Sequence, residues 1–372
     1  MSYVIRPLNE ADDAEMEALE ALLRASDDEM LGGHEVRAVQ QAREGLADNE
    51  FRRIRYFVAD HRSEGIVACA FTRATLVENT DRLLFFLVVS AQHRGRGVGT
   101  KLADAAVALA RNLGRPTLAM SAALPATCDP HDPDLPSTRI ATRLGLSPVA
   151  LDIARAAPLP LTESVREAAE RQVASRSGEY VMECWRDRTP SNRIDDMVAM
   201  LNQFAADEPL EDKATQPTAW TRQRLANAEQ WALNVGRTSL TVAAVDREGR
   251  LVGFSEVQRS RAPGSTIAWQ RDTVVLPAHR GHGLGLRMKL ATHRDLASSG
   301  VQSVVTWNSQ ANPYMIGINE TLGYRIVSRE VGYRGSSFPL TTRERRHGLV
   351  LLSGPPGHII TDETVAAALD EE

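Results

Sequence analysis

Two glycine-rich stretches have residue types and a spacing that could do chemistry. The first runs from Arg94 to Gly99 after an apolar run ending at Val89, and the second runs from Arg280 to Gly285 after one ending at Val275. A strand that leads through such a loop into a helix presents consecutive backbone N–H groups at the helix N-terminus, where they can hold phosphate oxygens. One such stretch alone would fit an ordinary turn, but two in equivalent surroundings favour sites for a phosphate-bearing ligand.

A dinucleotide site is the competing interpretation of a glycine-rich loop. It would need the loop in a strand–helix–strand unit near the start of a domain, with an acidic residue about 20 positions later. Here a β-hairpin pattern precedes each loop, which argues against that site. The predicted hairpin strands are Arg55 to Asp60 with Gly65 to Ala70, and Leu240 to Asp246 with Leu251 to Val257.

The loops belong to a long internal repeat. Residues 88–99 return in similar form as residues 274–285, about 186 positions later, which is too long for a solenoid period and indicates a duplicated domain. After each loop the sequence predicts an amphipathic helix, a strand, and a Leu-Gly pair before a last strand. The helices are predicted over Lys101 to Asn112 and Arg287 to Ala297, and the strands that follow them over Thr117 to Ala122 and Val304 to Trp307.

The repeat divides the chain into segments. With 372 residues and 43% apolar side chains, the chain is long enough for two hydrophobic cores. We expect an N-terminal domain over residues 1–157, a linker over 158–177 with a short helix capped by Thr162, a C-terminal domain over 178–340, and a tail over 341–372. No function is assigned to the tail.

Composition narrows the function classes. The formal net charge of -5 does not favour nucleic acid or an anionic membrane as a partner. The three cysteines are far apart and lack metal-ligand spacing, so we expect reduced thiols and no metal site. The N-terminus does not resemble a secretion signal, and no run of about 18 apolar residues occurs. These features together predict a cytoplasmic protein.

At the loops the chain resembles the GNAT superfamily of N-acyltransferases. Its signature is Arg or Gln, two residues, Gly, one residue, then Gly or Ala, and residues 94–99 and 280–285 both fit it. The stretch from Gln270 to Gly285, with three later asparagines and residues 322–324, resembles the tandem actinobacterial members. The resemblance covers nearly the whole chain except the tail. It implies an α/β (α+β) protein of two tandem GNAT folds, each with a mixed, mostly antiparallel twisted sheet flanked by helices.

The resemblance also implies how acetyl-CoA would be held as the acyl donor. Loop amides would bind the pyrophosphate beside Arg96 or His282, and the backbone of Val89 or Val275 would pair with the pantetheine arm like an added strand. The implied cofactor-binding residues are Val274, Val275, Leu276, Arg280, Gly281, His282, Gly283, Leu284, Gly285, Leu286, Asn308 and Asn312, with Val89, Arg94, Gly95, Arg96, Gly97, Gly99 and Thr100 in the first copy.

Catalytic candidates favour the C-terminal copy. Many family members have a tyrosine acid four residues before the glycine of the Leu-Gly pair, but this chain has Ala141 and Asn319 there. The C-terminal copy still offers several polar residues nearby, whereas the N-terminal copy has a proline-rich run over residues 125–136. The catalytic candidates are Glu256 and Asp272 as bases, Tyr314 as acid, and Asn319. For each of these, an ordinary structural role remains open: solvated strand carboxylates, tyrosine packing, or helix capping.

The sequence therefore predicts transfer of an acetyl group to a primary amine of a small molecule by direct attack in a ternary complex, by a monomer or homodimer. Two alternatives stay open: a non-catalytic acyl-CoA-binding or regulatory protein, and a protein or peptide N-acetyltransferase. Four tryptophans either line an acceptor pocket or pack in the core. These are Trp220, Trp231, Trp269 and Trp307.

Overall fold

The fold is described from a computed structural model, which covers residues 3–175, 180–207, 215–309 and 312–338. The predicted tail over 341–372 lies outside these residues. Met1–Ser337 forms one compact unit. Among the helices described, none combines the length and the apolar character needed to cross a membrane.

The two copies contain the same elements in the same order. The first copy contains β1 (Tyr3–Pro7), α1 (Asp13–Leu31), α2 (Val39–Leu46), β2 (Arg52–His61), β3 (Gly65–Thr75), β4 (Arg82–Val89), η1 (Ala91–His93), α3 (Val98–Asn112), β5 (Thr117–Pro125), α4 (Pro136–Leu144) and β6 (Ser147–Pro158). The connecting helix is α5 (Glu163–Ala174). The second copy contains β7 (Val181–Arg186), α6 (Ile194–Asp207), α7 (Arg222–Asn234), β8 (Arg237–Val245), β9 (Leu251–Ser260), β10 (Ile267–Val275), η2 (Pro277–His279), α8 (Leu284–Ala297), β11 (Ser303–Ser309), α9 (Pro313–Thr321) and β12 (Arg325–Ser336).

These elements confirm the hairpins, helices and strands predicted around the loops. One detail of the linker prediction was wrong. Thr162 is the N-cap residue of α5, but its side chain makes no cap hydrogen bond to the helix backbone. Its hydroxyl lies 3.3 Å from the Ser164 hydroxyl instead.

The last strands of the two copies are exchanged. In the described residues, twelve strands form one sheet in the order β1-β2-β3-β4-β5-β12-β6-β11-β10-β9-β8-β7. Thus β12 pairs with β5 of the first copy, β6 pairs with β11 of the second, and β6 and β12 pair with each other. The two expected sheets are therefore one continuous sheet. Each half of that sheet contains one strand from the other half of the chain. The predicted boundaries at 157 and 178 therefore mark the sequence repeat, and they do not separate two independent sheets.

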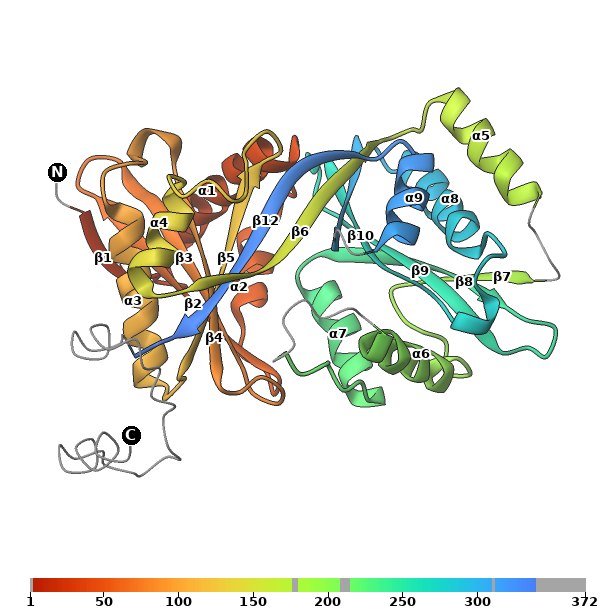
Figure 1. The fold of residues 1–372 in the computed structure, drawn as a ribbon, viewed down its shortest axis with the longest axis horizontal. Helices are drawn as coiled ribbons and strands as arrows, with labels where there is room; N and C mark the ends of the chain where they lie inside the picture. Colours follow the sequence, from red (N-terminus) through yellow and green to blue (C-terminus); the bar gives the residue numbers. More distant parts are fainter. Residues whose placement is uncertain (1–2, 176–179, 208–214, 310–311, 339–372) are drawn as a thin grey trace, which may run out of the picture. The chain divides into compact units, whose positions relative to one another are not determined.

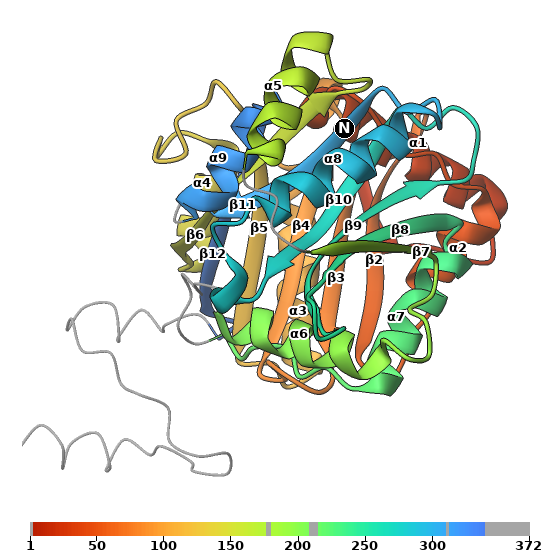
Figure 2. The same cartoon turned by 90° about the vertical axis from the view of Figure 1, so that its right-hand side faces the viewer.

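Helices cover both faces of each half of the sheet (Figures 1 and 2). In the second copy, apolar residues of α8 pack on one face of β8 and β9, while α6 and α7 pack on the other. In the first copy, α3 and α4 cover one face and α1 and α2 the other. This arrangement leaves the ends of β4 and β10, where the glycine loops begin, at the junction of sheet and helix.

Candidate functional site

Both glycine loops have a backbone suited to hold an anion. Gly95 and Gly97 have φ of 73° and 77°, and Gly281 and Gly283 have φ of 85° and 71°, a left-handed conformation that side chains disfavour. Gly97 and Gly283 are the N-cap residues of α3 and α8, and neither can supply a capping side chain. A Cβ atom added at Gly95, Gly97 or Gly281 would meet nothing within 4 Å, so the backbone there faces open space.

The signature arginines close the loops. Arg94 donates from Nε to the carbonyl of Val89, and Arg280 donates from Nε to the carbonyl of Val275, each at 3.0 Å. In the first copy the Arg94 guanidinium also forms a bidentate ion pair with Glu29 at the end of α1. Part of the signature therefore fixes the loop conformation, and the role of each arginine toward a cofactor stays a prediction.

Two strands diverge directly before each loop. β10 and β11 pair in parallel only where Ile267–Trp269 lies opposite Ser303–Val305. Beyond Trp269, β10 pairs with β9 alone. The opening between β10 and β11 is called the splay. The Leu276 N–H donates to β9, and successive N–H groups of a strand point to opposite sides, so the N–H of Val275 points toward the splay. β4 and β5 diverge in the same way after Phe86 and Ser121. A pantetheine arm could add to either strand as an extra strand.

A β-bulge brings the two predicted bases of the second copy together. The register between β10 and β9 shifts between Gln270 and Thr273, so Arg271 and Asp272 stand opposite Glu256. The buried Gln270 amide fills the bulge and donates to the Glu256 carbonyl at 2.7 Å and the Ser255 hydroxyl at 3.1 Å. These bonds replace the ladder bonds that the bulge interrupts.

Glu256 has the electrostatics of a base that works near neutral pH. Burial raises the pKa of Glu256 to about 7; the charge of Asp272 adds to this rise, while Arg271 opposes it. Burial also raises the pKa of Asp272. The Glu256 carboxylate accepts one hydrogen bond, from the Gln258 amide at 2.7 Å, and its side chain remains partly exposed. A partly buried carboxylate of this kind is matched to proton abstraction at neutral pH.

The first copy has no such carboxylates at the equivalent positions. Phe71 on β3 and Phe86 on β4 stand opposite each other, and their rings stack with centroids 4.6 Å apart. The ladder between β3 and β4 is regular, so no bulge places a second residue opposite Phe71. The asymmetry predicted between the copies thus extends to the strands that would position a base.

Three of the predicted asparagines have defined positions. Asn319 is fully buried on α9 and donates from Nδ2 to Oδ1 of Asn308 at 2.6 Å. Asn312 caps α9 by accepting the Met315 N–H at 3.1 Å. By contrast, the Tyr314 side chain is 86% exposed, and its role as the acid stays a prediction.

The remaining cofactor candidates fall into two groups. Leu284 and Leu286 are buried in the core under α8, so any contact they make with a cofactor would be through their backbone. A Cβ at Gly285 would lie 3.1 Å from Ile318, which explains the glycine by close packing. Gly99, its counterpart, has ordinary contact distances to its neighbours. The other candidates, Val274, Leu276, His282, Arg96 and Thr100, lie on the strand ends, loops and first helical turns described above.

The first copy closes the side of the second copy on which Glu256 lies. The loop between α1 and α2 is bonded to β9 and β10 through His34 and Val36, which contact Thr266 and Ser260. Glu35 in this loop is 6% exposed. Despite its burial, a bidentate ion pair with Arg237 holds the pKa of Glu35 below its ordinary value.

Tryptophans gather around this contact. Trp269 donates from Nε1 to Glu35 at 3.3 Å and stacks on Trp307 with ring centroids 5.5 Å apart. Arg237 lies over Trp231 and Trp269, at 5.7 and 5.9 Å from the ring centroids. Trp220 instead packs against the core of α6 and α7. Trp307 is 39% exposed, so the stacked pair offers an aromatic surface on the face that carries Glu256.

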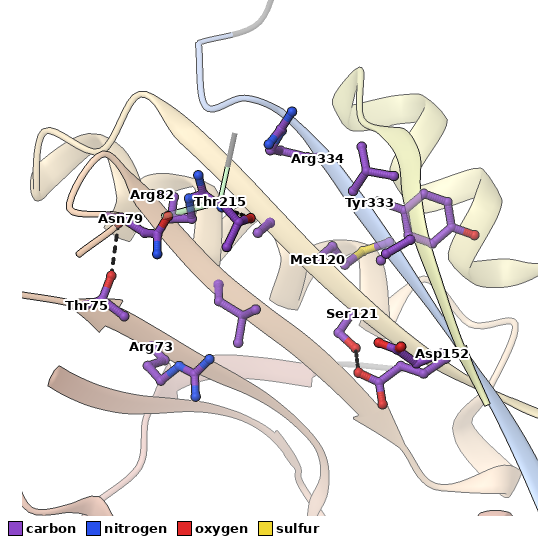
Figure 3. Close-up of a pocket in the computed structure, with 16 residues that line it drawn as sticks. Arg73, Thr75, Asn79, Arg82, Met120, Ser121, Asp152, Thr215, Tyr333 and Arg334 are labelled. Atoms are coloured by element: carbon purple, nitrogen blue, oxygen red, sulfur yellow. Dashed lines mark hydrogen bonds between the residues drawn. The ribbon is translucent and has the colours of Figure 1, made fainter. Parts of the chain in front are cut away.

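A separate cavity of about 300 Å3 lies on the first half of the sheet. Figure 3 shows its guanidinium groups, from Arg73, Arg82 and Arg334, and the acidic Asp152 near Ser121. Glu330 accepts a hydrogen bond from Ser121. Its lining comes from β3 to β6 and β12 and from Thr215, and so does not include Glu256 or Asp272. Sequence reasoning missed this cavity because its residues converge only when β12 inserts between β5 and β6.

The structure also assembles three residues of metal-binding type that the sequence did not single out. The ligand atoms of His61, Glu64 and His93 lie within 4.8 Å of one another. Glu64 is 3.2 Å from the His61 Nδ1 and 3.4 Å from the His93 Nε2, and His93 is also bonded to the Ser90 hydroxyl at 3.0 Å. The Glu64 carboxylate thus lies at ion-pair distance from both histidines, and the ligand types also suit zinc.

We predict that removing metal leaves the protein unchanged. Dialysis against a zinc chelator should leave the melting temperature and any acyltransfer rate as they were, since the Glu64 carboxylate already lies within ion-pair distance of both histidines. His93→Gln serves as the matched control. It weakens the cluster whether or not a metal is present, so its melting temperature shows the effect of losing the cluster without any chelator. Stoichiometric metal by elemental analysis, with a melting temperature that falls on chelation, would contradict the prediction.

Comparisons with known proteins agree with this geometry. Residues 17–126 match the model of the Acetyltransferase (GNAT) family. No curated protein matches the chain. A tandem GNAT protein from the clavulanic acid biosynthesis pathway, solved without AcCoA, is 21% identical, with a TM-score of 0.69 over 91% of this chain and 100% of that one.

Two further structures share the fold. A GCN5-related N-acetyltransferase from Sphaerobacter thermophilus is 15% identical, with a TM-score of 0.62 over 91% of this chain and 96% of its own. A Saccharomyces cerevisiae N-myristoyltransferase with bound MyristoylCoA is 10% identical, with a TM-score of 0.53 over 90% of this chain and 82% of its own.

The fold and the loops share one plan. The chain has two repeated α/β copies, and in each copy one strand diverges from its neighbour before a glycine loop and a helix. Residues 17–126 match the GNAT acetyltransferase family model, and the chain has the fold of a tandem GNAT protein.

Proposed function

We propose that the protein transfers an acetyl group from acetyl-CoA to a primary amine of a small molecule, and that the C-terminal copy is the catalyst. The observation that carries the proposal is Glu256, whose pKa burial raises to about 7, on β9 next to the strand that leads into the glycine loop. The first copy has the same loop but stacked phenylalanines in place of the carboxylates.

In this proposal acetyl-CoA lies along β10. The loop N–H groups at Gly281 and Gly283 hold the pyrophosphate, and the outward N–H of Val275 pairs with the pantetheine arm. The thioester then lies near the bulge, where Arg271 and Asp272 stand opposite Glu256. Positioning of the two reactants supplies much of the rate enhancement in a ternary complex.

Glu256 acts as the base, directly or through one water. The amine nitrogen forms a bond to the acetyl carbon, the carboxylate takes the amine proton, and the C–S bond breaks with its electron pair left on sulfur. The products are the amide, a protonated Glu256 and the CoA thiolate. Asp272 contributes by raising the pKa of Glu256, which keeps a stronger base at the site.

The stacked Trp269 and Trp307 are proposed as the acceptor surface, closed on one side by the loop that holds Glu35. This gives the first copy a supporting role in the second copy's site. A groove open to a long peptide would instead favour a protein N-acetyltransferase, and the absence of turnover with any amine would favour a regulatory acyl-CoA-binding protein.

We predict that CoA binds at the C-terminal loop. Calorimetry should detect binding, and hydrogen exchange should slow at the backbone amides of residues 281–285 and at Val275, because those N–H groups would become hydrogen-bonded. The N-terminal loop, residues 95–99, gives an internal comparison in the same experiment. Binding without protection at residues 281–285 would place the cofactor elsewhere, and no heat at millimolar CoA would contradict the proposed donor.

A further inference from the structure

Three hydrogen-bonded side chains lead from the interior of the second copy to the splay. Lys289 on α8 donates from Nζ to Oδ1 of Asn319 at 2.5 Å, and Asn319 donates from Nδ2 to Oδ1 of Asn308 at 2.6 Å. Lys289 is 1% exposed and Asn319 is 0% exposed, whereas Asn308 is partly exposed. We call Lys289, Asn319 and Asn308 the amide chain.

Lys289 determines the direction of this chain. Its Nζ donates to the oxygen of Asn319, which leaves the Asn319 NH₂ group to donate onward. Asn308 therefore receives that bond on its oxygen. Since the oxygen and nitrogen of an amide lie on opposite sides of a planar group, the Nδ2 of Asn308 is turned away from Asn319, and among the described residues it has no acceptor.

The surroundings of Lys289 hold no counter-charge. No ion pair joins it to a carboxylate anywhere in the described ranges, and its Nζ lies 5.0 Å from the centroid of the Tyr324 ring. Tyr324 in turn bonds to His293 at 2.8 Å. Burial lowers the pKa of Lys289 to about 7 and that of His293 to about 3, and it raises the pKa of Tyr324. A buried amine without an acidic partner costs stability, so its presence needs a reason.

The first copy shows that the fold does not need this polar group. The alignment of the two copies places Ala103, Ala141 and Ala122 where the second copy has Lys289, Asn319 and Asn308. These alanines pack together in one apolar cluster. The neighbours of Lys289 differ in the same way, because the cluster also holds Ala106, Val107 and Leu146 at the positions of Thr292, His293 and Tyr324.

The amide chain and Glu256 lie on opposite faces of the sheet. Phe254, two residues before Glu256, packs with α6 and α7, so alternation along β9 places Glu256 on that face. Asn308 is bonded to α9, which lies on the α8 side. An amine activated by Glu256 would therefore approach the thioester from one face, while Asn308 is positioned to meet the sulfur from the other.

We propose that Lys289 is a positioning residue that holds Asn308 so that its Nδ2 donates to the thioester sulfur as the C–S bond breaks. This rests on the proposed function. The sulfur keeps the electron pair and leaves as a thiolate, and the amine proton goes to Glu256. A donor aimed at developing charge stabilises the transition state, and the hydrogen bond that Lys289 donates to Asn319 holds the amide chain that presents this donor.

A double-mutant cycle on the full chain tests the proposal. Lys289→Met and Asn308→Ala should each lower kcat about tenfold, with the KM for acetyl-CoA within about twofold of wild type, because the donor acts mainly on the leaving sulfur. The double variant should lose no more than the larger single loss. Lys289→Gln, which keeps an N–H donor, should recover most of the lost kcat and serves as the second variant if methionine prevents folding.

Thr292→Val is the matched control. It removes a fully buried hydroxyl one turn along the same helix, outside the amide chain, and should leave kcat unchanged. Losses that multiply in the double variant, a raised KM, or an equal kcat loss in Thr292→Val would overturn the proposed role of Lys289. A wild-type protein that binds acetyl-CoA but acetylates no amine would overturn the proposed function and this role with it. That result comes from the wild-type protein alone, so it is distinguishable from a failure in the variants.

Discussion

Replacing Gly283 by valine is expected to remove most amine acetylation, whereas replacing Gly97 by valine is expected to leave most of it. Each valine places a branched side chain where the pyrophosphate would approach the loop. The loss of one or two hydrogen bonds to a charged phosphate corresponds to about 100-fold weaker binding at that site. If the C-terminal copy carries the chemistry, only Gly283→Val removes acyl donor from the catalytic site.

The two variants control for each other because the backbone is strained equally in both. Gly97 and Gly283 have φ of 77° and 71° and both are N-cap residues, so a β-branched residue costs each copy about 1–3 kcal/mol of stability. Melting curves measure that cost separately from activity. Equal loss of acetylation in two folded variants would mean that both copies are needed, and loss only in Gly97→Val would assign catalysis to the first copy.

The repeat, the hairpins and the helices after the loops could be predicted from sequence because each depends on local patterns. Alternating apolar residues and glycines at turns predict the same element wherever it packs. The exchange of β6 and β12 could not be predicted in this way. Both are last strands of equivalent copies, and the pattern of a strand does not identify which neighbour it pairs with.

The site was predictable in part. The glycine loops and Glu256 follow from motif and position, but the pairing of Glu256 with Asp272 depends on a β-bulge that forms only against β9. Lys289 was missed because a lysine in an amphipathic helix ordinarily lies in solvent. The signal that would have found it is the comparison of the copies, where Lys289, Asn308 and Asn319 all replace alanine.

Glu256→Gln is expected to lower kcat by about 100-fold or more, the usual contribution of a general base. In wild type, the rate should rise with pH through about 7, because Glu256 works as a carboxylate and its pKa is raised to about 7. Glu256→Gln should lose this rise. Asp272→Asn should move it to lower pH, because removing the Asp272 charge removes one cause of the raised pKa.

Phe71→Leu in the first copy is the matched control for Glu256→Gln. It changes the equivalent strand position without touching a carboxylate, so the pH dependence should stay as in wild type. A pH profile that is the same in wild type and Glu256→Gln would show that another group takes the amine proton. A rise that moves to higher pH in Asp272→Asn would contradict the proposed coupling between the two carboxylates.

Amine-dependent release of free CoA from acetyl-CoA, followed in wild type, Gly97→Val and Gly283→Val against a panel of primary amines, tests most directly whether the C-terminal copy is an N-acetyltransferase. We predict release in wild type and in Gly97→Val with at least one small amine, and almost none in folded Gly283→Val. No release in wild type with any amine, or full release in Gly283→Val, would contradict it.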